Sequence, residues 1–190
     1  MTINNTGNND GNIAGRDIYI NSSTKRKLPA YLSKVINSIA DIVSKEKVNL
    51  ENNLGTSFKI DEKINYNNII KYRYFINEYF VYCDDCEKRL NISDDSEPGI
   101  KSRIFKYVKD VYEKELTKYI KDRRQKIEIV KENSDNIFTN VIELLKKSIM
   151  ESSNVEIYQE DLEVAVSCFV CYCFIECKIF EKPLLEGKKW

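Results

Sequence analysis

The sequence contains no histidine and, among 190 residues, only three prolines, six glycines and one tryptophan. The lack of histidine excludes histidine general bases, Ser–His and Cys–His nucleophile pairs, and every metal site that needs imidazole. Neither sign of charge is in excess, because 30 basic side chains balance 30 acidic ones. The whole chain therefore has no field that would attract nucleic acid or anionic lipid. A P-loop, a Gly-rich dinucleotide loop and a nucleophile elbow are also missing. These absences favour a protein without a catalytic site or a cofactor.

Long apolar runs are missing as well. The longest run, 164–175, is interrupted by Ser167 and is shorter than the ~20 residues that a membrane span needs. The Asn- and Gly-rich first 15 residues have neither the basic nor the apolar region of a signal peptide. We therefore expect a cytoplasmic protein without membrane contact, in which the six cysteines stay reduced.

Apolar residues recur at helical spacing from Pro29 onward. They predict an all-α fold, a single helical bundle of about five helices that spans 27–190. The predicted helices run from Pro29 to about Lys47, over 69–90, from Ile100 through 121–126, over 136–151, and from about Gln159 to Phe180. The last one is apolar on almost all sides and should be the central element.

The boundaries between these helices follow from polar and turn-forming residues. A polar connection ends near Asn67, and the segment 93–99, with Glu97-Pro98-Gly99, separates the second helix from the third. The polar triplet 133–135 (Asn-Ser-Asp) predicts a break with a new N-cap. The triplet 152–154 should end the fourth helix, and Pro183 should stop the fifth.

Residues 1–26 form a separate N-terminal segment. Their Asn and Gly content predicts a flexible tail that contains one β-strand at about 13–20. A single strand needs a partner for its backbone groups, which a second copy or another protein can supply. In that pairing, Ile13, Ile18 and Tyr19 would supply side-chain contacts, and Gly15 would permit close approach of the backbones. Arg16 and Asp17 would set the register.

Two clusters invite a metal-site interpretation. Cys83 and Cys86 have the spacing of a zinc knuckle, which cysteines within 168–177 could complete. Both groups fall on apolar helix faces, so the favoured interpretation is that they are core cysteines. Asp61-Glu62-Lys63 and Asp84-Asp85 would suit a small metal-dependent nuclease. Acidic groups of this length are common on solvated helix faces, which is the alternative to a nuclease site.

The basic runs 25–27 and 121–126 are the places where the chain could contact nucleic acid. Asp122, Glu128 and Glu132 lie close to the second run and offset its charge. We therefore expect a solvated helix face there and a DNA contact only through a larger complex.

Three segments resemble a known family. Segment 58–69 with its KINYN stretch, followed by Tyr72 and 76–79, is similar to the KIEYN-type segment of C-terminal domains in bacterial ABC-three-component anti-phage systems, of which Lamassu is a type. Segments 136–138 and 158–162 fit the same family, and 173–183 resembles its terminal helix with closing aromatic, acidic and proline residues. The resemblance covers about 28–185.

That resemblance implies a subunit that links an effector to an SMC-like ABC ATPase. Only the 26-residue N-terminal segment precedes the predicted helical domain, so we expect no effector domain here. The expected function is non-enzymatic assembly within a defence complex, with self-association through the N-terminal strand. Lys178, Phe180 and Pro183 are the candidate partner-binding residues. An amyloid-type or oligomerising signalling adaptor, a zinc module and a small nuclease are the alternatives.

Overall fold

The structure is a computed structural model that describes residues 30–44, 58–121 and 125–183. In this part of the chain it has seven α-helices, one short 3-10 helix and no strand. The elements are α1 (Tyr31–Val43), α2 (Phe58–Tyr66), α3 (Arg73–Tyr79), η2 (Phe80–Tyr82), α4 (Cys83–Ser96), α5 (Ile100–Thr117), α6 (Lys126–Met150) and α7 (Gln159–Ile175). The all-α prediction is confirmed for these residues. The predicted strand at 13–20 and the tail boundary at 26 lie outside them.

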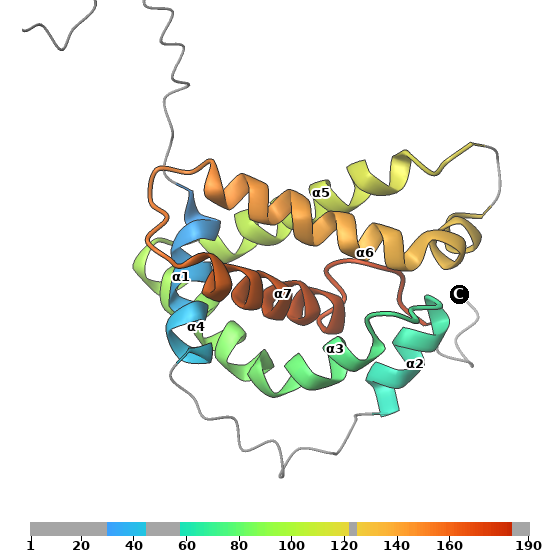
Figure 1. The fold of residues 1–190 in the computed structure, drawn as a ribbon, viewed down its shortest axis with the longest axis horizontal. Coiled ribbons are helices and arrows are strands. Elements are labelled where there is room, and N and C mark those ends of the chain that lie inside the picture. Colours follow the sequence, from blue (N-terminus) through green and yellow to red (C-terminus); the bar gives the residue numbers. More distant parts are fainter. Residues whose placement is uncertain (1–29, 45–57, 122–124, 184–190) are drawn as a thin grey trace, which may run out of the picture.

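Helix α7 is the central element, as the sequence predicted. It lies in the middle of the ribbon, with α5 and α6 along one side, α3 along the other and α1 and α4 towards one end (Figure 1). Every residue from Cys168 to Phe174 is buried, so no face of this stretch is left to solvent. A helix that is apolar all round is stable only when other helices cover it on all sides. None of the helices in the described ranges combines the length and apolar character needed to cross a bilayer.

The turn between α4 and α5 follows the sequence prediction. Helix α4 ends at Ser96, and Gly99 adopts a left-handed conformation (φ 89°) directly before α5. A residue without a Cβ takes this conformation at little cost. The Asp94 carboxylate accepts hydrogen bonds from the backbone N–H groups of Gly99 and Lys101, at 3.0 and 2.9 Å. These contacts satisfy donors at the start of α5 that the helix itself leaves unpaired.

The predicted break at 133–135 is wrong, because α6 continues through it from Lys126 to Met150. The polar side chains at this point bind a neighbouring segment instead of capping a new helix. The Asp135 carboxylate accepts the backbone N–H groups of Ile70 and Lys71, at 3.2 and 3.1 Å. The Ser134 hydroxyl donates to the carbonyl of Asn68 at 2.7 Å. Helix α6 thus fixes the corner between α2 and α3.

The region 58–90 also corrects the sequence analysis. The segment before Asn67, predicted as a polar connection, contains α2, and the single helix predicted over 69–90 is divided into α3, η2 and α4. These differences raise the count from about five helices to seven. Ile60 and Ile64 give α2 a narrow apolar face, and both side chains are buried. Two isoleucines on one face of a nine-residue helix produce little helical periodicity, so the sequence signal for α2 was weak.

The connection between α5 and α6 lies earlier than predicted. Helix α5 ends at Thr117, so it does not continue through 121–126, and α6 begins at Lys126. The Lys126 ammonium lies 2.9 Å from Glu113 of α5 and 2.8 Å from Glu181 near the end of the described chain. These ion pairs hold the start of α6 against α5.

Candidate partner-binding surface

Lys63 joins two of the segments on which the family resemblance depends. Its side chain lies on α2, is only 3% exposed and donates hydrogen bonds to the carbonyls of Phe174 and Ile179, the latter at 3.1 Å. The ammonium also lies 4.4 Å from the centre of the Phe174 ring. Burial lowers the pKa of Lys63 below its ordinary value. The C-terminal end of α7 therefore receives a cation, which the helix dipole favours.

Asn67 holds the segment 176–183, here called the terminal loop, against the end of α2. Its side-chain amide donates to the carbonyl of Glu181 at 2.8 Å, and its side-chain oxygen accepts the Glu181 N–H at 3.0 Å. The terminal loop leaves α7 and ends beside α2 in the ribbon (Figure 1). Two residues of the KINYN stretch, Lys63 and Asn67, thus fix the path of the loop.

The terminal loop corrects the predicted end of the last helix. Helix α7 stops at Ile175, short of Phe180 and Pro183. Cys177 and Phe180 adopt left-handed conformations, with φ angles of 56° and 63°. The backbone N–H of Lys178 returns to the carbonyl of Cys173 at 2.8 Å, which is a common way to close a helix. The loop therefore has a defined path without any glycine.

The three predicted partner-binding residues lie in different environments. Lys178 is half-buried, and its ammonium lies 4.7 Å from the centre of the Phe105 ring. Pro183 is also half-buried. Phe180 is only 6% exposed and packs against the rings of Tyr112, Phe138 and Phe174 at centroid distances of 5.1, 5.8 and 5.5 Å. The Phe180 ring therefore packs mainly in the core, and its role in partner binding stays a prediction.

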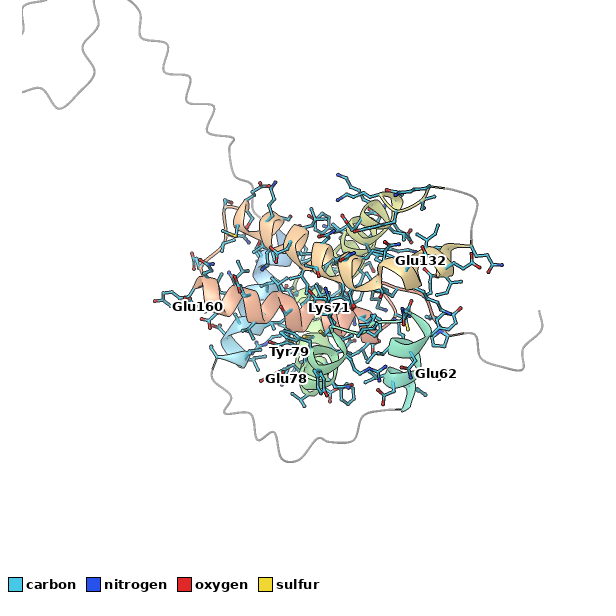
Figure 2. The ribbon with its side chains drawn as sticks, turned by 45° about the vertical axis from the view of Figure 1, so that its right-hand side comes forward. Glu62, Lys71, Glu78, Tyr79, Glu132 and Glu160 are labelled. Carbon is cyan, nitrogen blue, oxygen red and sulfur yellow. The ribbon has the colours of Figure 1, made fainter. Side chains whose placement is uncertain are left out.

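A surface that the sequence analysis did not select lies at the α2–α3 corner. Ile70, Tyr74 and Phe75 are 67%, 84% and 42% exposed, and together they are here called the corner patch. The Phe75 ring contacts Tyr72 and Tyr79, with centroid distances of 6.1 and 5.4 Å. Lys71, at the start of this corner, and Glu78 with Tyr79, at the end of α3, are labelled in Figure 2. The patch therefore has an aromatic centre and charged neighbours.

The corner patch is supported from below by the core. The Tyr72 ring stacks on Phe138 at 4.4 Å between centroids, and its hydroxyl lies 2.7 Å from that of Thr139 on α6. Contacts of this kind hold the exposed rings in position before any partner arrives, which lowers the entropy cost of binding. A sequence signal existed, since Ile70, Tyr74 and Phe75 fall between the inward positions Ile69, Tyr72 and Ile76.

The cysteines occupy the places expected of core residues. Cys86, Cys168, Cys171 and Cys173 are buried, whereas Cys83 and Cys177 are half-buried. The sulfur atoms of Cys86 and Cys168 lie 3.7 Å apart, between α4 and α7. Across the described ranges, the structure brings together no group of three or more Cys, Asp or Glu side chains that could hold a metal ion.

The carboxylates considered for a nuclease lie on different helices. Asp61 is on α2, where it lies 3.7 Å from the guanidinium of Arg73. Asp84 and Asp85 are in the first turn of α4, where the helix dipole favours negative charge. Asp61 thus pairs with the neighbouring helix α3, whereas Asp84 and Asp85 complement the dipole of their own helix.

The buried thiols predict a loss of stability in alkali. Burial raises the pKa of Cys83 from 9.0 to about 12. Burial also raises the pKa values of Cys171 and Cys173. The pKa of Cys86 is raised chiefly by its contact with Cys168. Above pH ~9 the unfolded thiols lose protons that the folded ones keep, so each group removes about 1.4 kcal/mol of stability per pH unit. The lowered pKa of Lys63 has the opposite effect, because it makes stability rise with pH, but it concerns a single group.

Urea unfolding at a series of pH values measures this effect. The midpoint should be nearly constant at neutral pH and should fall steeply above pH ~9. At equal temperature and salt, Cys171→Ala should make the fall in stability shallower by about 1.4 kcal/mol per pH unit, which is the contribution of one thiol. A midpoint that stays level through this alkaline range would show that the thiols are accessible to solvent in the folded protein.

Comparison with known protein families identifies a match over most of the chain. The family model described as C-terminal domain 10 (CTD10) of the ABC-three component (ABC-3C) systems matches residues 30–181. No curated protein and no solved structure matches the chain. The matched range contains the Lys63–Asn67 contacts, the corner patch and most of the terminal loop.

Proposed function

The chain belongs to the CTD10 family of ABC-three component systems, and we propose that it is a non-enzymatic assembly subunit. The members of these systems are anti-phage defence components. In this proposal it docks in the cytoplasm onto an SMC-like ABC ATPase or an effector of the same system. Any contact with DNA is made through the complex. The observation that carries the proposal is the corner patch, where three large apolar side chains lie exposed on a rigid part of the fold.

The composition of the corner patch supports a protein partner. Aromatic residues are enriched in the centres of protein interfaces, where a few of them supply most of the binding energy. Single exposed apolar residues are ordinary on a protein surface, but three large ones within the segment 70–75 favour a site of interaction. The Tyr72–Phe138 stack and the Asp135 contacts hold this group in place. A preformed aromatic surface of this kind suits docking better than catalysis.

The proposal predicts that Tyr74→Ser combined with Phe75→Ser weakens binding to the ABC ATPase of the same system about 30-fold or more. Loss of two aromatic side chains from the centre of an interface costs at least ~2 kcal/mol. Isothermal titration calorimetry on the purified subunits measures the affinity. The matched control is Ile92→Ser with Tyr158→Ser, which alters two other exposed apolar residues, 49% and 80% exposed.

Three results would contradict the proposal. The patch variant could bind the ATPase as tightly as the unchanged chain, or the control variant could lose as much affinity. The isolated chain could also hydrolyse nucleic acid or nucleotide by itself. Light scattering on the same samples gives the mass of the chain alone and thereby tests self-association through 13–20, which stays a prediction of the sequence.

A further inference from the structure

The terminal loop and α5 enclose a second surface feature, a hollow of about 430 Å³ that is here called the lysine groove. Phe105, Lys106, Lys109 and Tyr112 line it from α5, and Lys178 and Phe180 line it from the loop. Lys126 and its ion-pair partners Glu113 and Glu181 also belong to the lining. The groove therefore combines aromatic rings with several ammonium groups.

Three of these lysines have no acidic partner in the described part of the chain. Lys106 and Lys109 are exposed on one face of α5 and take part in none of the ion pairs found there. The Lys178 ammonium lies over the Phe105 ring and takes part in none of these ion pairs, whereas Lys126 is neutralised by Glu113 and Glu181. Like charges brought close together repel one another. Their positive charge is available to an anionic group from outside the chain.

The fold holds Lys178 in this position. Its backbone N–H is bound to the carbonyl of Cys173, and the loop is fixed at Glu181 by Asn67. Lys106 and Lys109 are held by α5, three residues apart and therefore on one helix face. The backbone positions of all three lysines are therefore fixed before a ligand binds, and only their side chains have to be ordered on binding.

We infer that the lysine groove binds an acidic segment of a protein partner, with carboxylates on Lys106, Lys109 and Lys178 and an apolar side chain on Phe105. Complementary charge gives such a contact its specificity and its association rate. This inference rests on the proposed assembly role, because it assigns a second contact to the same kind of complex.

The surroundings of the groove favour a protein segment over nucleic acid. Glu113 and Glu181 also line the groove, and Asp110 is exposed on α5 next to Lys109 in the sequence. These carboxylates would repel a phosphate backbone that extended beyond the groove. Nucleic-acid binding at physiological salt typically uses ~6–10 phosphate contacts, and three lysines supply far fewer. A short acidic segment does not need a longer binding site.

Fluorescence anisotropy on the full chain with a labelled polyglutamate peptide at low salt tests the inference. We expect binding that weakens as salt is added. Lys106→Glu, Lys109→Glu and Lys178→Glu together should lower the affinity at least about tenfold. The control replaces Lys34, Lys88 and Lys147 by Glu, which changes the net charge equally at three exposed lysines outside the groove, and should keep the affinity within about threefold.

The triple Lys→Gln variant at the groove positions provides a second measurement, because it removes the charges while keeping most of the side-chain length. It should lose part of the affinity and keep the circular dichroism spectrum of the unchanged chain. No binding of polyglutamate, or an equal loss in the control, would overturn the inference. Tighter binding of oligo-dT that the groove variants abolish would identify a nucleic-acid site and overturn it too.

Failure of this inference can be told apart from failure of the proposed function. The corner-patch variant Tyr74→Ser/Phe75→Ser should bind polyglutamate as well as the unchanged chain. If the chain binds polyglutamate through the groove but does not bind the ATPase, the groove is supported and the docking proposal fails. If the ATPase binds and polyglutamate does not, only the groove is refuted.

Discussion

Lys63→Ala should lower the free energy of unfolding by about 4 kcal/mol. Truncation removes a buried stem, which typically costs ~2 kcal/mol or more through lost packing, and two hydrogen bonds from a charged donor, worth ~1.5–3 kcal/mol each before the cost of burying the charge is subtracted. That cost is real, because burial lowers the pKa of Lys63. Packing and hydrogen bonding together still outweigh it, since the ammonium donates to two carbonyls and lies against the Phe174 ring.

Two further variants separate the contributions. Lys63→Met keeps the stem and should cost about 2 kcal/mol, mainly through the Ile179 carbonyl that is left without its donor. Lys59→Ala removes an exposed lysine from the same helix and should change stability by less than ~0.5 kcal/mol. Urea unfolding followed by circular dichroism measures all three. If Lys63→Ala behaved like Lys59→Ala, the ammonium would have to be solvated and the contact between α2 and the terminal loop absent.

The parts of the fold that the sequence predicted well have a strong periodic signal. The inward series Ile100, Ile104, Val108, Tyr112 and Leu116 is buried on α5 at regular helical spacing, so the start and type of this helix were evident. The apolar stretch of α7 likewise predicted its central place. Both signals are local and need no knowledge of the rest of the chain.

The errors arose where tertiary contacts replaced local ones. Ser134 and Asp135 have the character of N-cap residues, but their hydrogen bonds go to the α2–α3 corner while α6 continues. The apolar stripe from Ile76 to Leu90 runs across η2 without interruption, because three residues of 3-10 helix change the helical phase only slightly. A pattern of apolar spacing cannot reveal a break that preserves its phase.

The terminal loop was the hardest part to predict. Left-handed conformations at Cys177 and Phe180 carry no glycine signal, and non-glycine residues adopt them only when surrounding contacts compensate for the strain. Here those contacts come from Lys63 and Asn67, more than a hundred residues earlier. The resemblance had identified both segments, but only the structure shows that they bind each other.

Phe180→Ala decides between a surface role and a core role for this residue. The structure predicts a loss of about 4 kcal/mol in the free energy of unfolding, because the ring packs against Tyr112, Phe138 and Phe174 and truncation of a buried Phe leaves a cavity. Alanine keeps the strain of the positive φ angle, so this loss measures packing alone. Phe180→Gly should be about 1 kcal/mol less destabilising, since glycine adopts that conformation freely.

The matched comparison for Phe180 is Phe75, whose ring is 42% exposed in the corner patch. Phe75→Ala should lower stability by about 1 kcal/mol or less but should weaken association with the ATPase, because its ring serves a partner rather than the core. Phe180→Ala should show the reverse pattern, with a large loss in urea unfolding and unchanged affinity under conditions in which it stays folded. Weakened association with unchanged stability for Phe180→Ala would instead place this ring on the surface, and the closure of the core by the terminal loop would be wrong.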